Sequence, residues 1–310
     1  MLKRLSLAAA AVLCLSSPAL AEPLKVVASF SILGDMVRQV GGDAVVVTTL
    51  VGPDGDAHVY QPSPADAKAV AEADVVILNG LGFEPWGDKL VKASGTKAAV
   101  TKAAQGVKPR QMEAEEEHEH GHDHGKEEHG HGGKVTDPHA WQDLGNGKLY
   151  VANIAKALTA ARPAEATAIQ ARAAAYAKRL TELDAWVRAE LGAIPKAGRK
   201  IITGHDAFGY FGAAYGVTFL APVGISTEAE PTPKEVAKLV RQMKAEKVKA
   251  VFIENMSDSR LVEQLAKDAG GVVGGTLYAD ALSAADGPAA TYEAMFRHNV
   301  TALKAALSVK

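Results

Sequence analysis

The feature that most constrains the fold is a long helical pattern in the middle of the chain. Residues 163–191 are rich in Ala, Arg, Glu and Leu, and after the opening proline they contain neither Gly nor Pro. A helix of this length would extend about 43 Å, at about 1.5 Å per residue. That is enough to span a protein of 310 residues. We therefore expect this helix to connect two parts of the molecule.

On both sides of this helix, strand-like segments alternate with helix-like segments. Such alternation is typical of parallel sheets covered by helices. The expected strands are residues 24–30, 44–51, 75–78 and 98–101 before the helix, and 200–203, 250–254 and 272–278 after it. Capping signals at Ser63 and Thr232 mark two helix starts, and residues 292–307 form a last helical stripe. The fold class is therefore α/β, with two lobes joined by one long helix and a ligand expected between them.

The first 21 residues have the properties of a secretory signal peptide. Lys3 and Arg4 form a basic start, residues 5–15 are apolar, and Ala-Leu-Ala at 19–21 is a suitable cleavage site before Glu22. The apolar run is too short to span a bilayer, and no later stretch reaches about 20 apolar residues. The predicted location is the periplasm.

Cys14, the only cysteine, lies inside this signal. It is an alternative site for lipid attachment, but Leu13 precedes it where a small residue is expected. A mature chain without cysteine must hold any metal through nitrogen and oxygen. We expect four segments: the signal peptide 1–21, an N-terminal lobe 22–160, a linking helix 161–193 and a C-terminal lobe 194–310.

Residues 113–134 differ from the rest in composition. They contain eight acids and two lysines, and six of the ten histidines: His118, His120, His122, His124, His129 and His131. With hardly any apolar residue to anchor it, this segment is expected to be a mobile surface loop. Dense imidazoles and carboxylates bind zinc, copper or nickel loosely, so we predict an auxiliary metal-binding loop. The alternative is a solvated polar insertion without function.

Three of the other four histidines lie in loops between regular elements. His58 and His205 each follow a strand, and His139 follows the acidic segment. Asp280, at the carboxyl end of the last strand, is a fourth candidate ligand, although it could equally cap a helix. His298 lies inside the last helix, off its apolar stripe, and is most simply a surface residue. Three histidines in such loops favour one convergent metal site.

Four motifs resemble the metal-site motifs of the cluster A-I solute-binding proteins (solute-binding protein family 9), which serve zinc and manganese ABC importers. They are Asp-Ala-His58-Val-Tyr-Gln-Pro, Asp-Pro-His139-Ala-Trp, Gly-His205-Asp-Ala-Phe-Gly and Leu-Tyr-Ala-Asp280. The resemblance implies two lobes on a rigid backbone helix, with the metal in the cleft between them. It implies that His58 and His139 come from the first lobe, and His205 and Asp280 from the second.

The His-rich insertion is similar to that of the zinc-specific branch, the ZnuA-like and AztC-like proteins. A C-terminal disulfide found in some ZnuA proteins is absent. Three imidazoles and one carboxylate suit tetrahedral Zn(II). In the manganese-type members a glutamate replaces the third histidine, so His205 favours zinc. Copper and nickel would also bind such a site in vitro.

The predicted function is high-affinity capture of zinc in the periplasm and its delivery to an ABC transporter permease. No Gly-x-x-x-x-Gly-Lys motif is present, so a separate ATPase subunit must hydrolyse ATP. A periplasmic zinc chaperone is a possible further partner, and the protein is expected to be a monomer. The balanced charge gives no indication of nucleic-acid binding.

Three alternatives stay open at this point. The chain could be a Mn(II) or other metal-binding protein, or a metal buffer or adhesin without a transporter. It could also be a zinc hydrolase with an open coordination position, in which Glu254 is the one candidate general base. We expect no His-Glu-x-x-His helix that would support this last alternative, and we expect no enzymatic activity.

Overall fold

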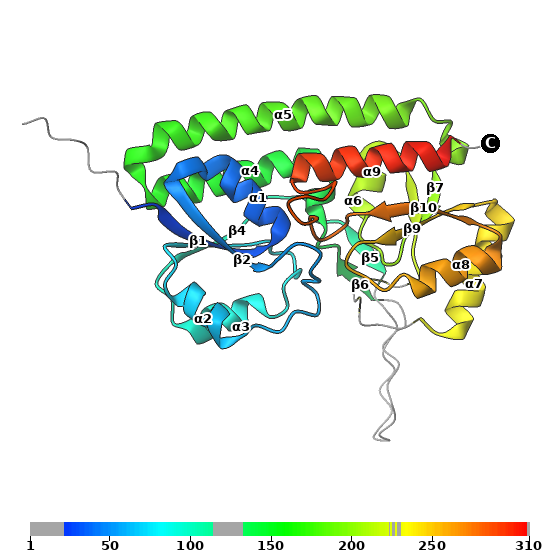
Figure 1. The fold of residues 1–310 in the computed structure, drawn as a ribbon, viewed down its shortest axis with the longest axis horizontal. Coiled ribbons are helices and arrows are strands. Elements are labelled where there is room, and N and C mark those ends of the chain that lie inside the picture. The colour runs from blue at the N-terminus through cyan, green and yellow to red at the C-terminus, as the bar shows by residue number, and fades with distance from the viewer. Residues whose placement is uncertain (1–21, 114–132, 223, 225–226, 228–230, 309–310) are drawn as a thin grey trace, which may run out of the picture.

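The computed structural model describes residues 22–113, 133–222, 224, 227 and 231–308. The predicted signal peptide and the six histidines between 118 and 131 lie outside the described residues. Within these ranges the chain forms two α/β lobes side by side, as predicted (Figure 1).

The N-terminal lobe contains a four-stranded parallel sheet in the order β2-β1-β3-β4. Its elements are β1 (Leu24–Phe30), α1 (Ser31–Gly41), β2 (Val45–Val51), α2 (Pro64–Ala71), β3 (Val75–Leu78), α3 (Gly87–Ser94) and β4 (Ala99–Lys102). The four predicted strands are all confirmed to within a residue. The predicted helix start is also confirmed, because Ser63 and Asp66 form a capping box at α2.

The C-terminal lobe contains a second parallel sheet, in the order β10-β9-β7-β8. Its elements are β7 (Lys200–Ile202), α6 (Gly209–Tyr215), β8 (Thr218–Leu220), α7 (Pro233–Glu246), β9 (Ala250–Glu254), α8 (Arg260–Ala269), β10 (Val272–Leu277) and α9 (Tyr292–Leu307). Thr232 and Glu235 form the expected capping box at α7. The short elements α6, β8 and α8 are not among the predicted ones.

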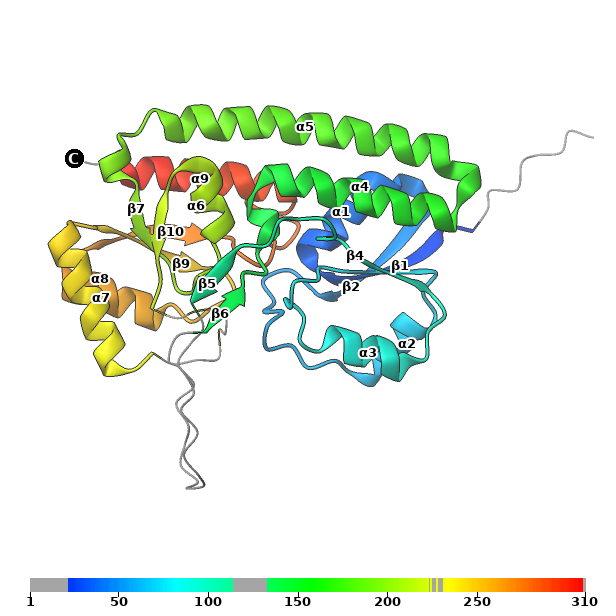
Figure 2. The same ribbon diagram turned by 180° about the vertical axis from the view of Figure 1, so that it is seen from behind.

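Two helices connect the lobes. The chain leaves the first lobe through a short antiparallel pair, β5 (Gln111–Glu113) and β6 (Lys134–Thr136), and enters α4 (Leu144–Ala161). The long helix α5 (Ala166–Gly192) then packs beside α4 and runs along both lobes (Figures 1 and 2). It is shorter than the predicted linker 161–193, because residues 163–165 form a separate 3-10 turn. The sequence pattern did not predict α4, whose first turn contains two glycines.

One hydrophobic core extends through both lobes. It includes Trp141 from the first lobe and Phe211 from the second, together with a buried stripe on α5: Ile169, Ala173, Tyr176, Leu180, Leu183, Val187 and Leu191. A smaller core, with Leu239, Val251 and Leu265, lies between helices α7 and α8 and the second sheet. Burial of this shared core favours a fixed arrangement of the lobes. None of the described helices is long and apolar enough to cross a membrane.

Candidate metal centre

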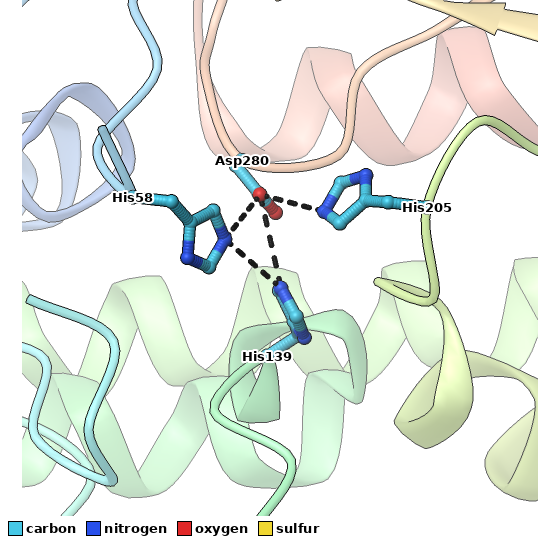
Figure 3. A group of neighbouring side chains, drawn as sticks. All are labelled: His58, His139, His205 and Asp280. Atoms are coloured by element: carbon cyan, nitrogen blue, oxygen red, sulfur yellow. Dashed lines mark hydrogen bonds and ion pairs between the residues drawn. The ribbon is translucent and has the colours of Figure 1, made fainter. Parts of the chain in front are cut away.

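The four candidate ligands come from four different loops and meet between the lobes (Figure 3). His58 follows β2, His139 follows β6, His205 follows β7 and Asp280 follows β10. Strands β2, β7 and β10 belong to parallel sheets, so these loops leave the carboxyl ends of strands, where such sheets usually place ligands. His139, His205 and Asp280 are buried, and the His58 side chain is 6% exposed.

The side chains of these residues converge on one small volume. One ligand atom from each of the four lies within 4.8 Å of the others. His58 Nε2 and His205 Nε2 are each 3.0 Å from Asp280 Oδ2, and His139 Nε2 is 3.7 Å from it. His139 Nε2 lies 3.4 Å from His58 Nε2. Ligands around a tetrahedral zinc ion are about 3.3 Å apart, given bonds of about 2.0–2.1 Å. The separations of 3.0–3.7 Å given above lie close to this spacing.

Carboxylates fix the rings of two of the histidines. Asp137 Oδ1 accepts a hydrogen bond from His139 Nδ1 at 2.9 Å, and Glu254 Oε2 pairs with His205 Nδ1. Because the Nδ1 atoms are occupied by these carboxylates, the lone pairs of the neutral imidazoles lie on Nε2, directed at the centre. This is the tautomer that a metal ion requires of both rings.

Each of these carboxylates also holds the backbone of its ligand loop. Glu254 Oε1 accepts hydrogen bonds from the N–H groups of Gly204 (2.7 Å) and His205 (3.0 Å). Asp137 Oδ1 accepts from the His139 N–H at 3.0 Å. Positions of the ligand rings are thus fixed by several hydrogen bonds and not by side-chain rotamers alone.

His58 is held in a different way. Asp56 Oδ1 accepts a hydrogen bond from its backbone N–H at 2.9 Å, and its ring lies edge-on to Phe83 at 4.8 Å between centroids. Asp56 also accepts a hydrogen bond from Thr227 of the second lobe at 2.5 Å. The loop that carries His58 is therefore tied to both lobes.

In the pKa values of Asp280 and His205, the effect of neighbouring charges opposes the effect of burial. Burial raises the pKa of Asp280, but the nearby His139 and His205 lower it more, so it lies well below the usual range. Burial lowers the pKa of His205, but the charges of Glu254 and Asp280 raise it well above the usual 6.5. Asp280 Oδ1 is buried and has no hydrogen-bond partner among the described residues. A buried carboxylate oxygen without a partner is costly, and a cation would remove that cost.

Asp280 is fastened to the first lobe, although it follows a strand of the second. The carbonyl of the preceding residue, Ala279, accepts hydrogen bonds from Trp141 Nε1 at 3.0 Å and Gln142 Nε2 at 2.7 Å. Both donors adjoin the His139 loop. His58 and His139 precede α5 in the chain, and His205 and Asp280 follow it, but these contacts position Asp280 together with His139.

The remaining predicted residues have other roles. His298 is partly buried on α9, where its Nε2 lies 2.9 Å from the Thr276 carbonyl and its ring meets Tyr278 edge-on. It is not among the four convergent residues, and its contacts are structural. Glu254 is engaged with His205, which leaves it no free position from which to act as a general base. The role of Asp137 was missed, although the Asp-x-His spacing that it shares with Asp56 and His58 is a usable signal.

Comparison with known proteins decides the family. The family described as "Zinc-uptake complex component A periplasmic" (ZnuA) matches residues 26–306. The chain belongs to this family. Its members and relatives are substrate-binding transport proteins, so the chain is a metal-binding substrate-binding protein of an ABC importer and not an enzyme. The hydrolase alternative is wrong.

Individual relatives of this ZnuA-family chain bind different metals. It is 33% identical over 287 residues to the manganese-binding lipoprotein MntA of Halalkalibacterium halodurans, covering 93% of this chain and 89% of the relative. It is also 33% identical to the iron ABC transporter substrate-binding lipoprotein MtsA of Streptococcus pyogenes, with coverage of 93% and 90%. The periplasmic zinc-binding protein TroA of Treponema pallidum has a similar structure, with a TM-score of 0.82, 28% identity and coverage of 93% and 100%. The fold is thus confirmed, and the kind of metal is left to the chemistry of the site.

Proposed function

We propose that this protein captures Zn(II) outside the cytoplasm and delivers it to the membrane permease of an ABC importer. The proposed ligands are His58, His139, His205 and Asp280. The observation that carries the proposal is the convergence of three imidazole Nε2 atoms and one carboxylate oxygen within 4.8 Å. Imidazole-rich tetrahedral sites of this kind suit zinc.

Zinc is favoured over manganese and iron by the donor set. Mn(II) prefers carboxylate, carbonyl and water ligands in octahedral geometry. Here one carboxylate faces three imidazoles, and aromatic rings lie beside two of them: Phe83 packs against His58, and Trp141 lies 5.4 Å from His139. The competing function is import of manganese or iron. It is favoured by the names of the relatives MntA and MtsA, which give manganese and iron as their metals.

A competition experiment distinguishes these functions. The purified full chain is stripped of metal, and then titrated with Zn(II), Mn(II) and Fe(II) against chelators of known affinity. Zinc should bind with a 1:1 stoichiometry at the central site and displace manganese. A preference for Mn(II) or Fe(II) over Zn(II) would overturn the zinc assignment and leave the transport function intact.

The auxiliary role of the His-rich segment stays a proposal. The titration is repeated on a chain that lacks residues 114–132. This deletion removes all six histidines of the His-rich segment. We expect the high-affinity zinc to remain and only weaker zinc to be lost, because ordering such a segment costs chain entropy. Loss of the tight zinc on deletion would make this segment the principal site.

We further propose that residues 1–21 are a cleaved export signal and that the mature protein is a periplasmic monomer. The names of MntA and MtsA describe lipoproteins, which gives weight to Cys14 as the competing processing site. The intact mass of the protein purified from the cell envelope decides between them. A chain beginning at Glu22 supports the cleaved signal, and a lipidated chain beginning at Cys14 overturns it. A chaperone that supplies the zinc is proposed as a further partner.

A further inference from the structure

Helix α7 and the turn that follows it carry an unusual concentration of positive charge. Residues 233–249 contain six cations and two acids. Both acids are already engaged: Glu235 closes the capping box, and Glu246 pairs with Lys200 at 2.7 Å. The cations are all exposed: Lys234, Lys238, Arg241, Lys244, Lys247 and Lys249. We call these six residues the lysine stripe.

The stripe lies on the outer side of the helix. Leu239 and Met243 are buried and attach α7 to the second sheet. Lys234, Lys238 and Arg241 follow each other at intervals of four and three residues, so they share one helix face. Within the described ranges, no carboxylate forms an ion pair with any of the six cations. Their charge is therefore not neutralised by any carboxylate of the described residues.

An exposed apolar side chain lies at the end of the stripe. Val272 begins the edge strand β10 and is 67% exposed, the highest value among the exposed large apolar residues of the described chain. Its N–H donates a hydrogen bond to the Lys249 carbonyl at 2.7 Å, which places it beside the last cation. Basic residues next to an exposed apolar side chain are typical of surfaces that lie on membranes.

We propose that the lysine stripe is a docking surface for the anionic headgroups of a lipid bilayer. The stripe extends about 20 Å along one helix and its turn, at about 1.5 Å per residue. Six exposed cations lie along this length. Such a row suits a planar array of phosphates. Helix α7 lies on the side of the molecule away from α5 (Figures 1 and 2), so binding there leaves α5 facing the solvent.

This surface is independent of the metal centre. Docking would concentrate the protein near the membrane in which a permease resides, with or without bound zinc. Binding of this type is mainly electrostatic, so it should weaken as salt shortens the screening length from about 10 Å at 0.1 M to about 3 Å at 1 M.

The test measures sedimentation of the full mature chain with lipid vesicles. One set of vesicles contains phosphatidylglycerol and phosphatidylcholine, and the other contains phosphatidylcholine alone. The stripe variant carries four substitutions: Lys234→Gln, Lys238→Gln, Arg241→Gln and Lys244→Gln. The control variant removes the same charge from exposed positions of the first lobe: Lys68→Gln, Lys89→Gln, Lys92→Gln and Lys97→Gln.

We expect the unsubstituted chain to bind only the anionic vesicles and to be released at high salt. The stripe variant should bind at least about 100-fold more weakly, because each cation contributes appreciably near an anionic surface, and the control should bind almost normally. Thermal unfolding and zinc stoichiometry check that both variants are folded, and the single substitution Lys238→Glu provides a milder variant. Equal losses in the two variants would overturn the proposal. So would binding to polyglutamate without binding to vesicles, which would instead point to an acidic protein partner.

Discussion

The protonation of His205 leads to the sharpest prediction about zinc binding. Glu254 faces its Nδ1, and Asp280 Oδ2 lies 3.0 Å from its Nε2. When no metal is bound, both contacts favour the ring that carries a proton on each nitrogen. Burial lowers the pKa of His205, but the two carboxylates raise it well above 6.5. A zinc ion that binds Nε2 must therefore displace a proton at neutral pH.

The size of the effect follows from this displaced proton. Below the raised pKa of His205, the zinc dissociation constant should fall tenfold for each unit of rising pH, or about 1.4 kcal/mol. Over two pH units below that raised pKa, the affinity should therefore rise about 100-fold. Above the raised pKa the contribution of His205 to this dependence ends.

The assay is a competition titration at pH 6, 7 and 8, with calorimetry in buffers of different ionisation enthalpy to count released protons. Replacing Glu254 by Gln removes one of the two carboxylates and lowers the pKa of His205, so the steep region should move to lower pH. Glu246→Gln, at a surface carboxylate paired with Lys200, is the control and should behave like the original chain. A flat affinity from pH 6 to 8 without proton release would refute the reasoning.

Three further predictions concern the same fold. Because the pKa of His205 is raised in the folded state, its protonation stabilises the metal-free protein. This contribution to the free energy of unfolding should be complete below pH 6.5 and be lost as pH rises through the raised pKa. Thermal unfolding at several pH values measures it. His205→Ala should weaken zinc binding by far more than deletion of residues 114–132, and equal losses in a zinc titration would contradict this. Gly147→Ala should lower the melting temperature, although alanine favours helices, because an added Cβ would lie 2.6 Å from the Tyr292 hydroxyl oxygen. Gly198→Ala, with nothing within 4 Å, is its control.

Local patterns in the sequence were sufficient for most of the elements. Strands β1, β3 and β9 begin and end at the expected residues, because a run of β-branched residues bounded by turns carries its own signal. The capping boxes at Ser63 and Thr232 are equally local, since all their hydrogen bonds lie within four residues. Helix α4 was missed because glycines weaken its first turn, and it is stabilised by packing against α5.

Only part of the candidate site could be predicted from the sequence. The sequence placed His58, His205 and Asp280 in loops after strands, since strand ends are visible in the hydrophobic pattern. Their convergence with His139 depends on the order of strands in two sheets and on a core shared by both lobes, which are long-range properties.

Tertiary structure alone decided which groups orient the ligands. Glu254 is 49 residues from His205 in sequence, and Ala279 is 138 residues from Trp141. Such pairings arise when burial brings distant segments together, and the desolvation of each polar group then requires a partner from whatever lies nearby. The sequence could thus name candidate residues for a metal site. Only the folded chain could show that the loop after β10 of the second lobe, which carries Asp280, is hydrogen-bonded to residues of the first lobe.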